Sequence, residues 1–152
     1  MTDTTPSHPR LILGSTSRYR RELLQRLHVP FDVASPDVDE TPHSAEAPRQ
    51  LALRLALAKA HAVAKQHPSC VVIGSDQVAD LGGTPLGKPG DHQRAVQQLQ
   101  QMRGRTVVFQ TAVAVVHLDA GFEQVDLAPV QVRFRALSDA AIERYLRTEQ
   151  PY

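Results

Sequence analysis

The sequence predicts an α/β protein built on one mixed β-sheet with helices packed against it. Short apolar runs alternate with segments of helical periodicity in the first half of the chain, and two long β-prone segments joined by a tight turn occupy the second half. The chain has 152 residues, of which 41% are apolar, which is enough for one ordinary domain. No linker or internal repeat divides it. We therefore expect a single domain over 1–152, with a flexible segment at 1–10.

The first elements are a strand, a turn and a helix. Residues 11–13 form a short apolar run that closes at the small residues 14–17, and leucines recur at helical spacing from Leu23 onward. Residues 31–34 predict a second short strand. Prolines and acidic residues at 35–46 then predict a loop.

An amphipathic helix is predicted from about residue 46 to residue 66. Its apolar stripe has the spacing i, i+4, i+7 and i+11, at Leu51, Leu55, Ala58 and Ala62. The pair His67-Pro68 ends it. The apolar run 70–73 then predicts a strand buried on both faces, as in sheets covered by helices, and Asp76 comes shortly after that strand.

The next elements are a short hairpin and a third helix. Residues 78–86 predict a hairpin around Gly82-Gly83, and 87–90 form a tight turn. Asp91 is placed to cap the helix. The apolar face of that helix consists of Ala95, Val96, Leu99 and Met102.

A long hairpin and a last helix complete the predicted fold. Residues 106–118 are the longest β-prone stretch, and they turn at 119–121 into a partner strand that ends near Arg135. Residues 138–148 then predict the final helix.

Charge and composition exclude several classes of function. The chain has 17 Lys and Arg against 16 Asp and Glu, so no global field favours nucleic acid or an anionic membrane. No stretch approaches the roughly 20 apolar residues that cross a bilayer. The single Cys70 is expected to be a buried, inert thiol. Because residues 1–10 also lack the apolar core of a signal peptide, we expect a soluble cytoplasmic protein.

Small hydroxyl residues occupy the first predicted strand-to-helix turn. Ser15 and Ser17 lie in that turn, and Arg20 and Arg21 lie one turn into the helix. Free N–H groups at a helix N-terminus, together with hydroxyls and guanidinium groups, suit phosphate oxygens. A capping serine followed by solvated arginines is the alternative interpretation.

Carboxylates in two places are candidates for acid–base or metal chemistry. Asp76 follows a buried strand, and in α/β sheets ligands bind beyond the carboxyl ends of strands, although a turn aspartate is the alternative. The pair Asp39-Glu40 lies in a predicted loop, where it is either a metal or general-base site or a solvated pair.

Two lysines complete the set of candidates. Lys59 lies at the edge of the apolar stripe of its helix, where an ammonium needs a partner or must reach solvent. Lys88 lies between Gly87 and Pro89. It is either a cation of the candidate site or a solvated lysine in a turn. The seven histidines show no metal-binding spacing. Together, the cations could hold a polyphosphate while the carboxylates bind a divalent metal and activate water.

Six ordered motifs resemble those of the Maf-like nucleotide pyrophosphatases. They cover essentially the whole chain from Leu11 onward, and as a set they are highly specific. They are Ser15–Leu24, Val38–Thr41, Lys59–Ala60, Ile73–Gln77, Gly87–Pro89, and Gly104–Arg105 through Thr111–Ala112.

This resemblance implies a fold of the inosine-triphosphate-pyrophosphatase type (Maf/Ham1 architecture), with a central cleft between two lobes of a long mixed sheet. It implies hydrolysis of a nucleoside triphosphate to the monophosphate and pyrophosphate, with Mg²⁺ or Mn²⁺. By position, Asp76 would accept the proton of the attacking water, and Glu40 would support the metal or the water. The residues implied to contact phosphates are Ser15, Ser17, Arg20, Lys59 and Lys88.

Within the family, the chain resembles the branch that hydrolyses 7-methyl-GTP. Tyr19 stands where the dTTP and UTP branch has arginine, and an aromatic face attracts the cationic 7-methylguanine by roughly 0.5 to 2 kcal/mol. Gln77 replaces a threonine of that branch and can both donate and accept at the base edge. The resemblance thus predicts Tyr19 and Gln77 as substrate-binding residues.

Two alternative functions remain at this point. The dTTP and UTP pyrophosphatases belong to the same family, and a non-catalytic nucleotide-binding regulator of cell division belongs to another class. Members of the family continue beyond the position of Tyr152, so the resemblance implies that their C-terminal elements are absent here. It also suggests a homodimer, with a small-molecule nucleotide as the partner of the site.

Overall fold

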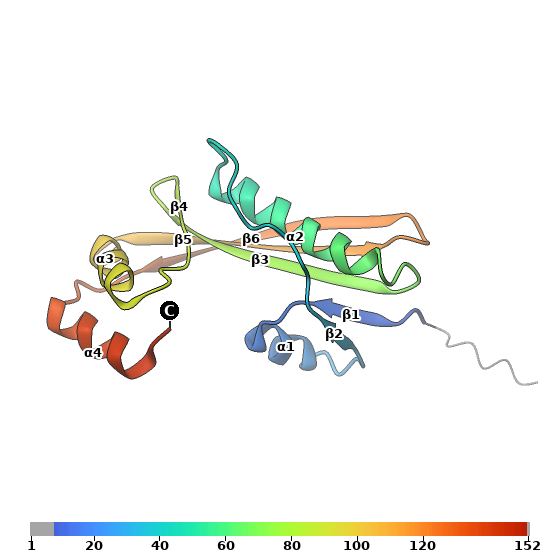
Figure 1. Cartoon of the computed structure of the whole chain (residues 1–152), viewed down its shortest axis with the longest axis horizontal. Helices are drawn as coiled ribbons and strands as arrows, with labels where there is room; N and C mark the ends of the chain where they lie inside the picture. The colour runs from blue at the N-terminus through green and yellow to red at the C-terminus, as the bar shows by residue number, and fades with distance from the viewer. Residues whose placement is uncertain (1–7, 152) are drawn as a thin grey trace, which may run out of the picture.

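The structure is a computed structural model that describes residues 8–151 (Figure 1). These residues form a six-stranded sheet and four helices. In chain order the elements are β1 Leu11–Gly14, α1 Arg18–Gln25, β2 Asp32–Ala34, α2 Pro48–Ala64, β3 Val71–Leu81, β4 Thr84–Leu86, α3 His92–Met102, β5 Thr106–His117, β6 Phe122–Arg133 and α4 Asp139–Glu149. The predicted α/β class and order of elements are confirmed. The prediction for residues 1–10 falls mostly outside the described residues.

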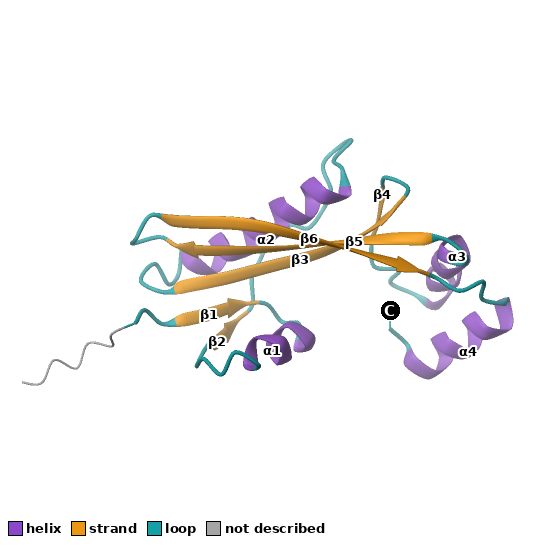
Figure 2. Ribbon diagram, turned by 180° about the vertical axis from the view of Figure 1, so that it is seen from behind, coloured by secondary structure: helices purple, strands orange, loops and turns teal. Residues whose placement is uncertain are grey.

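The sheet is mixed, as predicted. β1 pairs in parallel with both β2 and β3, whereas β3, β5 and β6 pair antiparallel. The strand order is β2-β1-β3-β5-β6, and β4 pairs with the end of β3. The three long strands β3, β5 and β6 extend through most of the length of the molecule, which makes it elongated (Figure 2).

α2 covers one face of this sheet and forms the main core with β1, β3 and β5. Its buried positions come in adjacent pairs one turn apart: Leu51 and Ala52, Leu55 and Ala56, Lys59 and Ala60, Val63 and Ala64. The predicted stripe is therefore only half correct, because Ala58 and Ala62 are half-buried and Lys59 lies within the buried face. Alanines occur on every side of this helix, so the spacing of its apolar residues could not by itself decide which face would be buried.

The close packing of α2 against β3 depends on Gly74. A Cβ at this position would lie 2.4 Å from the backbone oxygen of Ala56 and 2.6 Å from the backbone nitrogen of Ala60. No side chain fits between these backbones, and only glycine permits such an approach. The residues of β3 that share the face of Gly74, including Asp76, are thereby directed toward α2.

β3 differs from its prediction in length and in burial. A strand over 70–73 was predicted, but the strand continues through Asp76 to Leu81, so the prediction that Asp76 follows the strand is wrong. Gly, Ser and Asp are typical turn residues, but here each pairs with a residue of β5. Burial on both faces is also wrong, because Ile73 is only half-buried on the face away from α2.

α1 begins as predicted but does not bury an apolar face. The Ser17 hydroxyl accepts a hydrogen bond from the backbone N–H of Arg20 and caps the helix. Leu23 is 56% exposed, and Leu27, which lies beyond the end of the helix, is 65% exposed. The helix lies beside β1 and β2, away from α2 (Figures 1 and 2).

α3 and α4 pack together at the far end of the long strands. Ala95 of α3 forms a small core with Ile142 and Leu146 of α4. The predicted cap Asp91 is confirmed, since its side chain accepts a hydrogen bond from the first turn of α3, and the side chain of Ser138 caps α4 in the same way. Buried Cys70 has a free thiol, as predicted.

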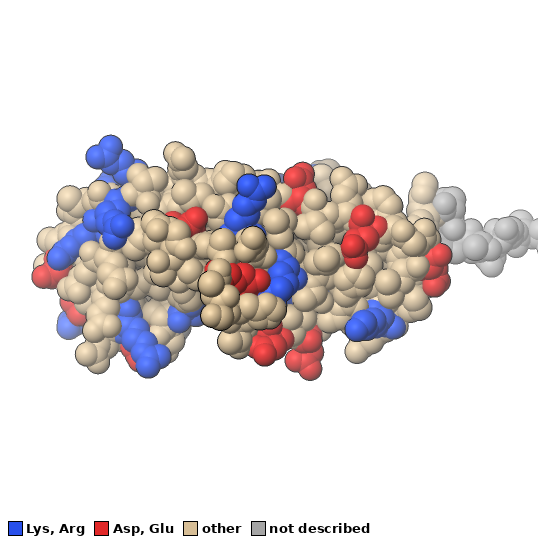
Figure 3. All heavy atoms as spheres, turned by 90° about the horizontal axis from the view of Figure 1, so that it is seen from above, with Lys and Arg blue, Asp and Glu red and all other residues tan. Residues whose placement is uncertain are grey.

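No helix within residues 8–151 combines the length and the apolar character needed to cross a membrane. On the face shown in Figure 3, basic and acidic side chains are interspersed along the molecule.

Candidate active site

Three predicted residues meet between α2 and the sheet. Lys59 of α2 lies with its Nζ 2.9 Å from Oδ1 of Asp76 on β3 and 2.5 Å from Oε1 of Glu40. Glu40 belongs to the segment 35–47 that links β2 to α2. One ammonium thus bridges two carboxylates that are far apart in the sequence.

The burial of this cluster explains why its members are paired. Lys59 is 9% exposed and Asp76 is 8% exposed, whereas the Glu40 side chain is half exposed. An unpaired charge at either buried position would be strongly destabilising, and mutual pairing offsets that desolvation. The mouth of the site is therefore on the side of Glu40.

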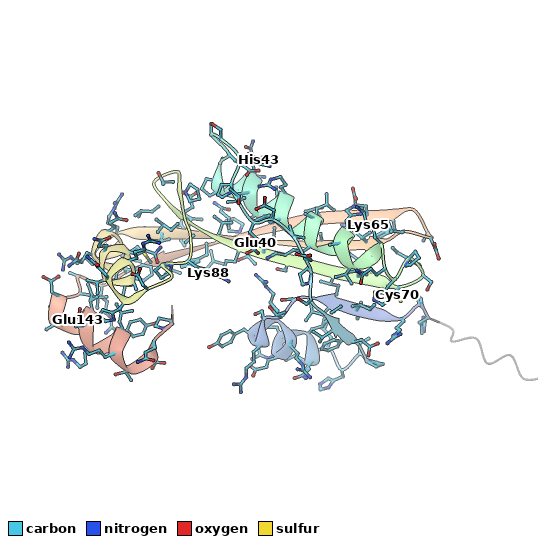
Figure 4. The ribbon with its side chains drawn as sticks, in the orientation of Figure 1. Glu40, His43, Lys65, Cys70, Lys88 and Glu143 are labelled. Carbon is cyan, nitrogen blue, oxygen red and sulfur yellow. The ribbon has the colours of Figure 1, made fainter. Side chains whose placement is uncertain are left out.

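The surrounding cations keep Glu40 ionised. Its hydrogen bond to Lys59 is the main cause that lowers its pKa below the ordinary value; burial opposes this, and the charges of Lys88 and Arg20 make smaller contributions that lower the pKa further. Lys88 lies in the loop after β4, where no tight turn forms at residues 87–90 as was predicted, and Figure 4 shows it near Glu40 in the middle of the molecule. The two basic residues thus belong to the same electrostatic site as Lys59.

A pocket of about 340 Å³ opens at this cluster, and we call it the charged pocket. It is lined by Ser15, Thr16, Ser17, Arg20, Pro36, Asp37, Val38, Glu40, Lys59 and Lys88. The hydroxyls of Ser15 and Ser17 accept hydrogen bonds from the backbone N–H groups of Ser17 and Arg20, which confirms the capping interpretation for Ser17, while phosphate binding stays a prediction. Each hydroxyl keeps its own proton, which it can donate to an anion.

A second pocket of about 470 Å³ adjoins the first and is more apolar; we call it the mixed pocket. It shares Arg20, Glu40, Lys59 and Lys88 with the charged pocket. The residues that line only the mixed pocket are Pro42, Leu51, Leu55, Asp76, Gln77, Val78, Pro85, Leu86 and Gly87. The two pockets together fit a ligand with one anionic part and one flat or apolar part.

The structure brings most of the predicted site residues together. Eight of them line one or both pockets: Ser15, Ser17, Arg20, Glu40, Lys59, Asp76, Gln77 and Lys88. Tyr19 lines neither pocket, and it is 79% exposed. Because neighbouring residues of a helix point about 100° apart, Arg20 faces the site and Tyr19 does not. Gln77 is exposed at the pocket wall, and its amide donates to Oγ1 of Thr111, 2.9 Å away.

Sequence reasoning missed the apolar walls of the mixed pocket. Leu51 and Leu55 were predicted as core residues, and nothing in their periodicity distinguishes a pocket wall from a core. Pro42 and Pro85 lie in segments that were predicted only as a loop and a hairpin. Tertiary packing brings both segments to the same pocket.

The donor set fits a divalent cation that binds together with a phosphate ligand. Mg²⁺ is often held by one or two carboxylates, with substrate phosphates completing its coordination. Glu40 and Asp76 provide such a pair, and no third His, Cys, Asp or Glu joins them within the described residues. Three cations and three carboxylates line the two pockets, namely Arg20, Lys59 and Lys88 against Asp37, Glu40 and Asp76. The site is nearly neutral, so it leaves most of the charge of a triphosphate to be balanced by other cations.

Comparison with known proteins agrees with this fold and with the motifs that build the site. A HAM1 protein of solved structure, from Coxiella burnetii, matches with a TM-score of 0.63 at 15% identity, covering 86% of this chain and 75% of that one. At this identity the match shows a shared fold alone.

Curated relatives are far more similar in sequence. A protein from Polaromonas sp. named 7-methyl-GTP pyrophosphatase is 72% identical over 151 residues, which are 99% of this chain and 69% of that protein. One from Albidiferax ferrireducens with the same name is 68% identical over 147 residues, covering 97% of this chain and 74% of that protein. A family model described as Maf-like protein matches residues 10–152. The chain belongs to the Maf-like protein family.

Proposed function

We propose that this protein hydrolyses a nucleoside triphosphate, with 7-methyl-GTP as its preferred substrate, to the monophosphate and pyrophosphate. The observation that carries the proposal is the Glu40–Lys59–Asp76 cluster where the charged and mixed pockets meet. A protein that only binds nucleotides needs cations but has no use for a buried water-activating carboxylate. Relatives at 72% and 68% identity carry the name 7-methyl-GTP pyrophosphatase.

In this proposal, the charged pocket binds the triphosphate. Arg20, Lys59 and Lys88 supply positive charge from three different segments, so they can surround the phosphates. The hydroxyls of Ser15 and Ser17 donate to phosphate oxygens at the N-terminus of α1, where the free N–H groups also favour an anion. The phosphates are thereby oriented with respect to Asp76.

Asp76 is the proposed general base. The oxygen of a water molecule attacks the α-phosphorus, the bond from that phosphorus to the oxygen bridging to the β-phosphate breaks, and pyrophosphate leaves with the bonding electron pair. The carboxylate of Asp76 takes the proton from the water. Lys59 lies 2.9 Å from Asp76 and orients its carboxylate before substrate arrives, and it can transfer part of its interaction to the phosphates.

Glu40 and Asp76 are the residues that would hold Mg²⁺ or Mn²⁺. When bound with the substrate, such a cation supplies charge neutralisation and Lewis-acid polarisation of the phosphate oxygens. The lowered pKa of Glu40 keeps its carboxylate ionised and available for this role at neutral pH.

The mixed pocket is the proposed site of the base. Its apolar side chains offer flat contact to a purine, and Gln77 lies in its wall with an amide that can donate and accept. Thr111 accepts one hydrogen from that amide and fixes its orientation. Because Tyr19 faces away from both pockets, Gln77 is the better supported of the two predicted selectivity residues.

The test is a substrate panel measured with this chain. We expect pyrophosphate release from 7-methyl-GTP in the presence of Mg²⁺, at a higher kcat/KM than from GTP, dTTP or UTP. Preference for dTTP and UTP would place the protein in the other enzymatic branch. Nucleotide binding without any release of pyrophosphate would instead identify a regulator.

We further propose that the protein acts in the cytoplasm, as a homodimer. The free, buried Cys70 is compatible with a reducing compartment. β6 is an edge strand with exposed Phe122 and Val130, which suits pairing with a second copy. Sedimentation should then show a dimer, and Val130→Lys should shift it toward the monomer. A monomer at all concentrations would contradict the proposed assembly.

A further inference from the structure

Besides the pair of Lys59 with Glu40, one side chain of α2, Arg54, fastens the segment that follows Glu40 to the helix. Nε of Arg54 donates to Oε2 of Glu46 at 2.7 Å, and Nη2 donates to Oε1 of the same carboxylate at 2.9 Å. Nη2 also donates to the backbone oxygen of Thr41 at 3.2 Å. One guanidinium therefore holds both ends of the segment 41–46.

Further hydrogen bonds extend this contact to the two sides of Glu40. The Glu46 carboxylate accepts from the backbone N–H of His43 at 3.0 Å, which closes the turn. The backbone N–H of Thr41 donates to Oδ1 of Asp39 at 2.9 Å. Glu40 lies between Asp39 and Thr41, so its backbone is held by a network that ends at Arg54.

Arg54 acts from outside the site. It lines neither the charged pocket nor the mixed pocket, whereas Lys59 on the same helix lines both. The Glu46 side chain is 9% exposed and that of Arg54 is 29% exposed, so this pair is partly sheltered from solvent. Such a pair is more persistent than an exposed one.

We propose that Arg54 is a positioning residue, which holds the Glu40 carboxylate against Lys59 by fastening the segment 41–46 to α2. The inference rests on the proposed function, because it assigns Arg54 to the same reaction. Arg54 donates its three hydrogen bonds from a planar guanidinium group with fixed N–H directions. A lysine ammonium at this position would reproduce the charge but not this geometry.

The first experiment is a double-mutant cycle between Arg54 and Glu40. We expect Arg54→Ala to lower kcat about tenfold to a hundredfold with a smaller change in KM, because misplacement of a catalytic group by about 1 Å has costs of this size. In a Glu40→Gln background the same substitution should lower kcat by less than about twofold, since the group that it positions is gone. Arg54→Lys should give an intermediate kcat.

A matched control lies on the same helix. Arg49 is exposed and forms no ion pair with the described residues, so Arg49→Ala should leave kcat unchanged. A merely structural role of Arg54 predicts the same loss of kcat in both backgrounds, and that result would overturn the proposal.

Amide hydrogen exchange provides a readout that does not depend on activity. Exchange at residues 41–46 should be faster in Arg54→Ala than in the wild type or in Arg49→Ala. Equal exchange in all three proteins would show that Arg54 does not fasten the segment. If the wild-type protein hydrolyses no nucleotide, the proposed function fails, while the exchange data still decide whether Arg54 fastens this segment.

Discussion

At the scale of single residues, the site depends on one ammonium shared by two carboxylates. Lys59 lies between Glu40 and Asp76, within hydrogen-bonding distance of both carboxylates, in a partly buried place. The role of each residue can therefore be separated by substitutions that preserve shape but change charge.

Asp76→Asn tests the general base. The amide keeps the size of the side chain but cannot take a proton from water, so we expect turnover to fall by at least about a hundredfold. Binding of 7-methyl-GTP, followed by calorimetry, should persist because Arg20 and Lys88 are untouched. Full activity in this variant would remove Asp76 from its proposed role.

Gln77→Thr and Tyr19→Arg test which position selects the base. The sequence predicts that arginine at position 19 repels a cationic base, but the structure places Tyr19 outside both pockets and Gln77 in the wall of one. We therefore expect Gln77→Thr to lower the ratio of kcat/KM for 7-methyl-GTP to that for dTTP by about tenfold. Tyr19→Arg should change this ratio less. The reverse order would restore Tyr19 as the selector.

At the scale of elements, the ends of helices could be read from the sequence but the phase of α2 and the extent of β3 could not. Asp91 and Ser138 act locally, and their capping bonds form within one turn. By contrast, the polar residues of β3 contradict local strand propensity. They are tolerated for two reasons. Gly74 has no side chain, so α2 can pack closely against the strand, and Lys59, which is distant in the sequence, pairs with Asp76. The sequence motifs identified the site residues, but only the tertiary packing brings these residues together.

Gly74→Ala tests the contact between α2 and β3. Its Cβ would meet backbone atoms of Ala56 at 2.4 Å, and backbone cannot turn aside as a flexible side chain can. We expect a loss of about 3 kcal/mol or more in the free energy of unfolding, measured with urea. Gly87→Ala is the matched control, because a Cβ there meets nothing within 4 Å, and it should change stability by less than about 0.5 kcal/mol.

At the scale of the whole molecule, ion pairs connect segments that secondary structure does not join. Arg54 and Glu46 tie the segment before α2 to that helix, and Arg103 and Asp139 tie the end of α3 to the start of α4. In both pairs the arginine lowers the pKa of the carboxylate. The stability of the fold is therefore expected to depend on acidity.

The stability of the fold is expected to decrease at acidic pH, and Glu46 is one cause. Arg54 lowers the pKa of Glu46 from 4.5 to about 2 in the folded protein. A carboxyl whose folded pKa is lowered contributes stability above its unfolded pKa, and this contribution is lost as the pH falls through the folded value. We expect the urea midpoint to decrease between about pH 4.5 and pH 2, the window given by those two values.

Glu46→Gln should flatten this part of the curve, because an amide does not titrate. Glu149→Gln is the control, since Glu149 is exposed and forms no ion pair with the described residues. A decrease of equal size in the wild type and in Glu46→Gln would assign the acid sensitivity to other groups.

The backbone contact at Gly74 also determines which parts of the pocket can move. Lys59 and Asp76 sit on a helix and a strand whose main chains touch, so these two residues form a rigid wall. The opposite side consists of the segment bearing Glu40 and of the β3–β4 hairpin with its following loop, which bears Lys88. Because Arg54 and Lys59 also hold the Glu40 segment to α2, we expect closure around the proposed nucleotide to come from the β3–β4 hairpin and the loop bearing Lys88, on the microsecond to millisecond timescale of lid motions. The proposed substrate would then meet a fixed base and a movable cation.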